Sequence, residues 1–136
     1  MSSIAWHLNQ QILKDGKARL FEGSGGYEAG EQLRDFVYVD DVVNVNLWFS
    51  EHPECSGIFN VGTGQASTFN DVANAVIRSL GKGAISYIPF PGALKESYQS
   101  FTEADIGALR TAGYEASFLD VRSGVSAYLN RLDAAK

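Results

Sequence analysis

Apolar side chains recur with the 3.6-residue period of an amphipathic helix in two clearly bounded stretches. In the first, residues 4–13 follow a pair of serines, either of which can cap a helix, and Gly16 supplies the stop. In the second, Thr68 and Asp71 have the spacing of a capping box, with aspartate in the usual glutamate place, and Gly81 ends the apolar pattern. We therefore expect a helix in each stretch.

Two further amphipathic stretches lie in the C-terminal part of the chain. Thr102 with Asp105, and Ser117 with Asp120, repeat the capping pattern ahead of them. Gly113 follows the first of these stretches. The pattern predicts two more helices, the first closed by Gly113.

Short runs with strand character alternate with these helices. They are residues 19–22, 58–61 and 84–88, which are rich in β-branched and aromatic side chains or alternate in polarity. Strands separated by helices are typical of an α/β or mixed α+β fold. We expect one domain, residues 1–136, with about five helices. A sheet of so few short strands is thin, which indicates that part of the protein lies elsewhere.

The run from Arg34 to Val42 carries the most information. Residues 36–39 have the composition of a buried strand, and the helical pattern behind them predicts a helix capped by Asp40 or Asp41. Arg34 stands just before this strand, where its planar guanidinium can pair with a phosphate or a carboxylate. A strand–helix unit with an arginine at its entrance indicates an anion- or nucleotide-binding part of an α/β enzyme.

Composition narrows the function classes. The chain has 136 residues, 45% hydrophobic and 20% charged, which suits one globular domain with a core. The formal net charge is −5 and the basic residues are scattered, so we expect no nucleic-acid partner, because such proteins need a basic surface. With no apparent secretory signal, no membrane span and a single cysteine, the expected location is the cytoplasm.

Several other residues have simple structural interpretations. Residues 62–64 are Gly-Thr-Gly, but Ser67 takes the place of the third glycine of a dinucleotide fingerprint, so we expect a structural turn and no cofactor-binding residue in this chain. His7 and His52 have no partners at metal-ligand spacing, and we expect no metal site. Cys55 and His52 lie in an irregular loop that offers no third group to orient a base.

Catalytic chemistry is missing from the sequence as well. No tyrosine is followed four residues later by a lysine, so we expect no catalytic residue for redox acid–base chemistry in this chain. Tyr98 lies in an irregular polar segment, residues 95–100. There it either packs on the surface or presents its ring and hydroxyl to a ligand, and both possibilities stay open.

Four runs together have a recognisable order: residues 21–24 (Phe-Glu-Gly-Ser), 34–41, 57–64 and 87–91 (Tyr-Ile-Pro-Phe-Pro). They resemble the C-terminal part of extended short-chain dehydrogenase/reductase (SDR) enzymes that act on nucleotide sugars. The second and third runs are shared by epimerases and dehydratases of that superfamily. The first and fourth, with the opening residues 3–9, are more particular to the ADP-glyceromanno-heptose 6-epimerase family. The resemblance covers essentially the whole chain.

The resemblance implies a set of substrate contacts. They come from His7, Phe21, Glu22, Gly23, Ser24, Arg34 and Tyr98. The physical interpretation agrees, because Arg34 can pair with a pyrophosphate and a glycine loop lets backbone approach a nucleotide. The loop of residues 25–32 is longer than in some relatives, which would alter how Arg34 approaches the sugar nucleotide.

The resemblance also implies an activity for the full-length protein. It would be an isomerase of lipopolysaccharide core synthesis that uses NADP to epimerise ADP-D-glycero-D-manno-heptose at C6″. The family's N-terminal Rossmann half, with its NADP site and Tyr-x-x-x-Lys pair, is missing from this sequence, as is a lysine shortly before its start. We expect an inactive fragment that binds ADP-heptose, packs on that N-terminal half, and forms a homo-oligomer, a pentamer in this family, when full length.

Two alternatives stay open. Because two of the four runs are shared across the superfamily, the chain also suits the substrate domain of a UDP- or dTDP-sugar epimerase or dehydratase. The missing Tyr-x-x-x-Lys pair equally suits a binding or oligomerisation module without catalysis. Affinity for different sugar nucleotides separates the first alternative from the heptose epimerase.

Overall fold

Five α-helices, one 3-10 helix and four short strands form the described part of the chain, residues 3–94 and 98–135 of a computed structural model. In chain order they are α1 (Ile4–Asp15), β1 (Lys17–Phe21), β2 (Leu33–Arg34), α2 (Val39–Glu51), β3 (Ser67–Thr68), α3 (Phe69–Leu80), β4 (Ala84–Ile88), η1 (Gly92–Leu94), α4 (Gly107–Thr111) and α5 (Val121–Ala134). This content confirms the expected mixed α/β class with few short strands.

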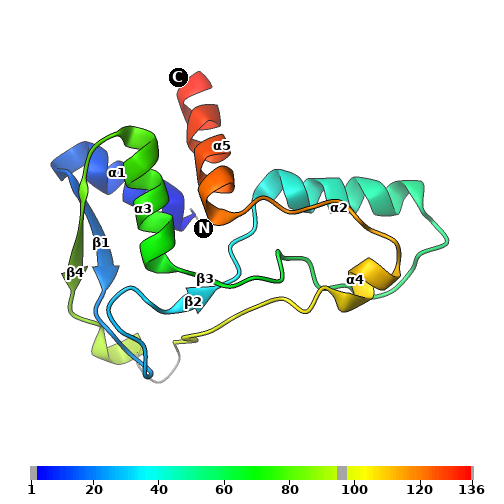
Figure 1. The fold of residues 1–136 in the computed structure, drawn as a ribbon, viewed down its shortest axis with the longest axis horizontal. Coiled ribbons are helices and arrows are strands. Elements are labelled where there is room, and N and C mark those ends of the chain that lie inside the picture. The colour runs from blue at the N-terminus through cyan, green and yellow to red at the C-terminus, as the bar shows by residue number, and fades with distance from the viewer. Residues whose placement is uncertain (1–2, 95–97, 136) are drawn as a thin grey trace.

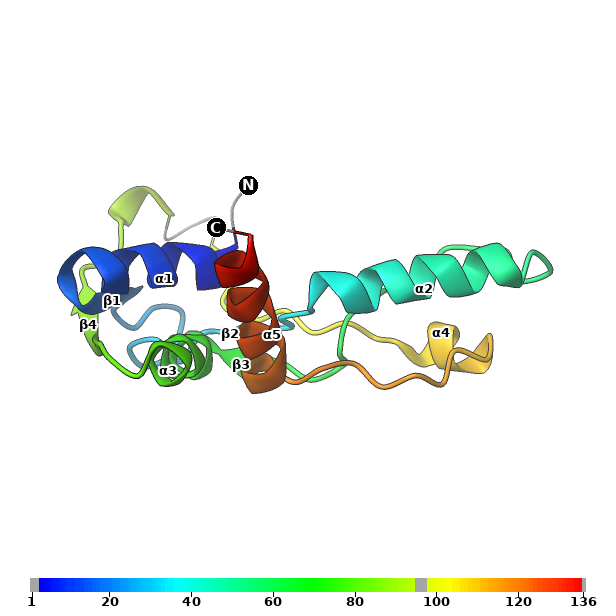
Figure 2. The ribbon, with the colours of Figure 1, turned by 90° about the horizontal axis from the view of Figure 1, so that it is seen from above.

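The chain forms a main lobe and an arm that extends from it. Figure 1 shows α1, α3, α5 and the strands in the main lobe, and α2 and α4 in the arm. The view from above in Figure 2 shows the same separation. Here "the arm" means residues 39–62 and 105–118.

The main lobe has its core where α1, α3 and α5 meet β1. Its most deeply buried side chains are Leu8, Ile12, Ala18, Leu20, Val72, Ala73, Val76 and Leu129. Each Leu, Ile or Val among them contributes about 1.5–3 kcal/mol by leaving water. A second, smaller cluster in the arm joins Val45, Leu109 and Tyr114.

The ends of α1 and α3 follow the sequence prediction. The Ser3 hydroxyl accepts a hydrogen bond from the Trp6 N–H at 3.2 Å, and α1 ends at a glycine in the left-handed region. Thr68 and Asp71 form the complete capping box, with each side chain accepting from the other residue's backbone N–H at 3.0 Å. Both predicted helices are confirmed, and both are defined by local sequence signals.

Two small sheets set up the region around Arg34. β1 pairs with β4 in parallel, so that Phe21 lies opposite Ile88 and both strands end at the same edge. β2 pairs antiparallel with β3, and Leu33 also bridges in parallel to Phe101. The segments that follow β1 and β4 therefore begin close together.

The strand predicted for residues 36–39 is absent, and with it the predicted cap. α2 begins at Val39, and its N-cap residue Tyr38 makes no side-chain capping bond. Asp40 and Asp41 lie inside the first turn. Asp40 pairs with Arg131 at 2.8 Å, and the buried Asp41 accepts from the Leu119 N–H at 2.9 Å. The two carboxylates therefore link α2 to the C-terminal segment. Their negative charge also interacts favourably with the positive N-terminal end of the helix dipole.

The strand predicted for residues 58–61 is also wrong. These residues form no regular secondary structure, and Ile58 is 99% exposed. A strand requires a neighbour for its ladder of hydrogen bonds, and no described segment supplies one here.

Two predicted caps are displaced. α5 is capped by Asp120, whose carboxylate accepts from the Ser123 N–H at 2.7 Å, and Ser117 lies outside the helix. α4 begins only at Gly107 without a side-chain cap. Thr102 instead donates its N–H to the Leu33 carbonyl at 3.1 Å. Asp caps a helix as well as Ser does, so for α5 the predicted cap was right in kind and wrong in position, whereas the cap predicted for α4 is absent.

Candidate functional site

Three of the predicted site residues converge beside the ends of β1 and β2. The Arg34 guanidinium carbon lies 5.1 Å from the centre of the Tyr98 ring. The Phe21 and Tyr98 rings are 6.5 Å apart, edge to face. We call Phe21, Arg34, Phe90 and Tyr98 the aromatic–arginine cluster.

Phe90 is the member that sequence reasoning missed. Its ring centre is 5.2 Å from that of Phe21 and 5.0 Å from that of Tyr98, so it packs against both. The signal was present, because Phe90 follows β4 at the sheet edge where β1 ends at Phe21. Seeing it required the parallel pairing of strands that lie more than sixty residues apart in the sequence.

Arg34 has unused hydrogen-bonding capacity. It is half-buried, and within the described residues its guanidinium makes one hydrogen bond, to the Leu33 carbonyl at 2.9 Å. A guanidinium has five N–H donors and forms its strongest contacts with carboxylates and phosphates. Its face toward Tyr98 is stabilised by a cation–π contact. Arg34 is therefore held in place yet available to an anion.

Tyr98 is partly sequestered from solvent. Burial raises the pKa of its hydroxyl, and the nearby Arg34 charge partly offsets that rise. The hydroxyl thus stays protonated near neutral pH, where it can donate or accept a hydrogen bond. The Tyr98 ring packs against Arg34, Phe21 and Phe90. A contact between its hydroxyl and a ligand stays a prediction.

The glycine-rich loop is tied down beside this cluster. The Glu22 N–H donates to the Ile88 carbonyl at 2.9 Å, and the amide of the buried Gln32 donates to the Glu22 carbonyl at 3.1 Å. Its tip is a tight turn in which Ser24 bridges to Tyr27. A β-carbon on Gly23 would lie 2.4 Å from the Tyr27 carbonyl oxygen, so only glycine fits there.

The loop tip also approaches the segment that carries Tyr98. A β-carbon on Gly25, which has a φ of +64°, would lie 2.5 Å from the Ser100 hydroxyl. Residues 22–24 consequently stand on the same side of the lobe as Tyr98. Of the predicted contacts, the structure thus gathers Phe21 to Ser24, Arg34 and Tyr98 into one region.

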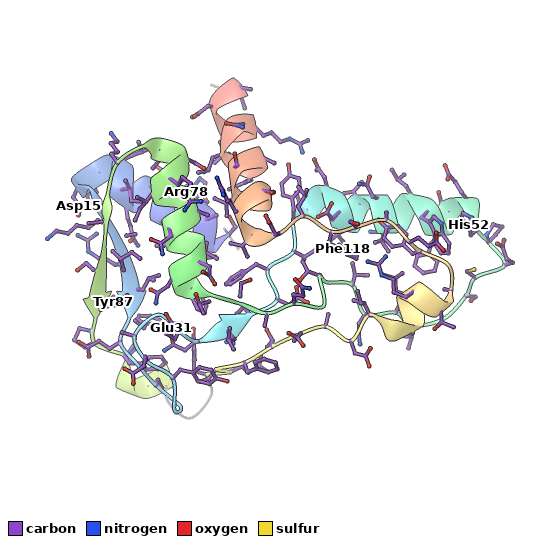
Figure 3. All side chains as sticks on the ribbon, viewed as in Figure 1. Asp15, Glu31, His52, Arg78, Tyr87 and Phe118 are labelled. Carbon is purple, nitrogen blue, oxygen red and sulfur yellow. The ribbon has the colours of Figure 1, made fainter. Side chains whose placement is uncertain are left out.

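Asn70 anchors the far half of the loop. Its side chain donates to the Ala29 carbonyl at 3.0 Å and contacts Glu31, and it accepts from the Tyr87 hydroxyl at 3.0 Å. Figure 3 shows Glu31 and Tyr87 on the same side of the main lobe, near β1 and β2. This role of Asn70 could not be predicted from the sequence, because its hydrogen-bond partners are 17 to 41 residues away.

His7 is not part of this cluster. It is exposed on α1, and its described ring contact is with Trp6, at 5.0 Å between centres. The His52 ring stacks on that of Trp48 at 4.1 Å, and its Nδ1–H donates to the Trp48 carbonyl at 2.8 Å. Figure 3 shows His52 near the far end of the arm. His52 is therefore a packing residue of the arm.

The Gly-Thr-Gly turn is structural, and Asp35 explains why. Its carboxylate accepts from the Thr63 N–H at 2.9 Å and from the Gly64 N–H at 2.9 Å, so the donors that would meet a pyrophosphate are already engaged. A β-carbon on Gly62 would lie 2.6 Å from the same carboxylate. This turn does not fit a dinucleotide cofactor.

Hydrogen bonds stabilise the Asp35 carboxylate in its charged form. Burial by itself raises the pKa of Asp35, but hydrogen bonds from Thr63, Ala104 and Gly64 outweigh it and leave the pKa below its ordinary value. Asp35 was not singled out by sequence reasoning, although it adjoins Arg34. Its partners lie 28 to 69 residues further along the chain.

The described residues contain no candidate metal site and no helix suited to spanning a membrane. No group of three or more His, Cys, Asp or Glu side chains in ranges 3–94 and 98–135 is placed to hold a metal ion. None of the helices in those ranges is long and apolar enough to cross a membrane.

This chain is similar in sequence to known epimerases. Residues 2–62 match the NAD dependent epimerase/dehydratase family. The chain is 50% identical to the ADP-L-glycero-D-manno-heptose-6-epimerase of Thiobacillus denitrificans, over 97% of this chain and 44% of that protein. The predicted resemblance to a heptose epimerase is confirmed. The chain spans less than half the length of this curated relative.

Solved structures agree with this resemblance. The heptose epimerase of Helicobacter pylori superposes with a TM-score of 0.77 at 30% identity, covering 98% of this chain and 38% of that one. The UDP-glucose 4-epimerase of Thermus thermophilus, solved with NAD, gives a TM-score of 0.75 at 21% identity, covering 98% of this chain and 40% of that one. The second likeness shows a shared fold only.

Proposed function

We propose that this chain is the substrate-binding part of an ADP-glyceromanno-heptose 6-epimerase. The observation that carries the proposal is Arg34, which is half-buried and lies 5.1 Å from the Tyr98 ring centre, with donors that the described residues leave free. The 50% identity to a heptose epimerase supports this substrate class over the UDP- and dTDP-sugars.

In the proposed site, a charged side chain, an apolar wall and the loop backbone each contact a different part of the ligand. Arg34 binds the pyrophosphate of the substrate with paired hydrogen bonds. Phe21 and Tyr98 provide an apolar wall, and the Tyr98 hydroxyl bonds a polar group of the ligand. The proposed contact set is His7, Phe21, Glu22, Gly23, Ser24, Arg34 and Tyr98. His7, which lies apart from the cluster, would contact a different part of the ligand.

Holding the sugar nucleotide in one orientation is how this part would contribute to catalysis, since a fixed geometry removes much of the entropy cost of reaction. In the full-length protein NADP would supply hydride transfer, and we assign its site and the proton-transfer pair to a part outside this chain. The engaged donors of the Gly-Thr-Gly turn support that assignment. The chain alone is then inactive.

The exposed apolar surface of the arm supports the proposal that a further part of the protein packs against it. Val39, Val43 and Leu47 follow helical spacing on α2 and are 46–56% exposed, and Ile58 is almost fully exposed. Contiguous exposed apolar side chains usually mark an interface. We propose that the N-terminal Rossmann half of the same protein covers them. The resemblance also supports a cytoplasmic protein of lipopolysaccharide synthesis that assembles as a homo-oligomer.

The nucleotide preference tests this function. Calorimetric titration of the chain with ADP-, UDP- and dTDP-sugars is expected to show tightest binding for the ADP-sugar, and incubation with NADP and ADP-heptose is expected to give no turnover. A preference for a pyrimidine nucleotide would contradict the heptose assignment. Turnover by the 136-residue chain would contradict the assignment of the catalytic groups to another part.

A further inference from the structure

Asp35 joins three segments that are far apart in the sequence. One carboxylate oxygen accepts from the Thr63 N–H at 2.9 Å and from the Thr63 hydroxyl at 2.6 Å. The other accepts from the Gly64 N–H at 2.9 Å and the Ala104 N–H at 3.1 Å. This one side chain therefore connects the Arg34 strand to the Gly-Thr-Gly turn and to the segment behind Tyr98.

The backbone of the same strand reaches the Tyr98 segment as well. The Leu33 N–H donates to the Ser100 carbonyl at 2.9 Å, and the Leu33 carbonyl accepts from the Thr102 N–H at 3.1 Å. Leu33 and Asp35 thus hold residues 100, 102 and 104 in a single register. Tyr98 precedes that register by two residues, and Arg34 lies between the two anchoring residues.

We propose that Asp35 is a positioning residue, which holds the Tyr98 segment in register so that Arg34 stays aimed at the substrate pyrophosphate. This inference rests on the proposed function. Asp35 itself does not touch the ligand, because all four of its hydrogen bonds go to the protein. Asp35 directly follows β2, and its carboxylate faces the Gly-Thr-Gly turn while Arg34 faces Tyr98.

The test compares Asp35→Asn with the matched control Asp105→Asn. Asp105 also accepts a backbone N–H, from Gly107 at 2.9 Å, but its bond is local and exposed. Two quantities are measured in the 136-residue chain: the affinity for ADP, and the NMR shift of the Arg34 Nε–H, which the Tyr98 ring displaces. Tyr98→Leu gives the reference shift without that ring.

Asp35→Asn is expected to move the Arg34 resonance toward the Tyr98→Leu reference and to weaken ADP binding about tenfold, as for the loss of a charge-assisted contact. Because it acts through Arg34, adding it to Arg34→Ala should weaken binding no further. Asp105→Asn should change neither quantity. An unchanged Arg34 resonance, or losses that add independently of Arg34→Ala, would overturn the positioning role.

Failure of the proposed function gives a different result. If the unaltered chain does not bind ADP, the substrate assignment fails, and the Arg34 resonance alone decides the role of Asp35. Should Asp35→Asn not fold, Gly62→Ala perturbs the same junction, since its β-carbon would lie 2.6 Å from both Asp35 and Ala104. It is expected to move the Arg34 resonance in the same direction, and an unmoved resonance would again contradict the proposal.

Discussion

Arg34 and Asp35 are neighbours with opposite roles. Most of the Arg34 donors have no partner among residues 3–94 and 98–135, whereas Asp35 accepts four hydrogen bonds inside the protein. The sequence predicted Arg34 as an anion contact, because an arginine before a strand has a local interpretation. It did not predict Asp35, whose partners only the folded chain brings near.

Asp35 should make stability depend on pH. Since its folded pKa lies below the ordinary value of 3.8, its charged form stabilises the fold, and this stabilisation is complete above about pH 5 and lost as pH falls through the folded pKa. Urea unfolding should show Asp35→Asn less stable by about 1–3 kcal/mol at pH 7. The difference should narrow below pH 4. A difference that stays constant down to pH 2 would contradict this account.

At the scale of elements, prediction succeeded where signals are local. α1 and α3 are bounded by caps and glycines within a few residues of their ends. Residues 36–39 and 58–61 have strand composition, but a strand also requires a partner, and the described chain provides none for them. The site follows the same rule, because Phe90 contacts Phe21 and Asn70 contacts the glycine-rich loop, and these partners are far apart in the sequence.

The cap of α5 is a sharp test at this scale. Asp120 accepts the Ser123 N–H at 2.7 Å, so Asp120→Ala should lower the free energy of unfolding by about 1 kcal/mol. Ser117→Ala, which removes the cap expected from sequence, should change it by less than about 0.5 kcal/mol. Thermal unfolding of both variants measures the difference. If Ser117→Ala lowered the free energy of unfolding more than Asp120→Ala does, Ser117 would be the cap, as the sequence pattern predicted.

At the scale of the molecule, the arm carries apolar side chains that nothing in the described chain covers. Val39, Val43 and Leu47 form one stripe along α2. Such a surface favours self-association in the isolated chain. The main lobe, which holds the proposed site, has its own core and its own ties to the glycine loop.

Charge placed on the stripe should reduce that association. Leu47→Glu is expected to lower dye binding to exposed apolar surface and to shift sedimentation toward the monomer, because a carboxylate opposes apolar contact. Leu13→Glu, at a similarly exposed leucine on α1, is the matched control and should have little effect. Equal effects of both substitutions would show that the α2 stripe has no special role.

The central claim is that Arg34 is the pyrophosphate contact of a nucleotide-sugar site. It is tested most directly by calorimetric titration of ADP into the unaltered chain, Arg34→Ala and Arg78→Ala. Arg78 is an exposed arginine on α3 and serves as the control for charge alone (Figure 3). Arg34→Ala should weaken binding by about 1.5–3 kcal/mol and Arg78→Ala should leave it nearly unchanged. Equal affinity of the unaltered chain and Arg34→Ala would contradict the account.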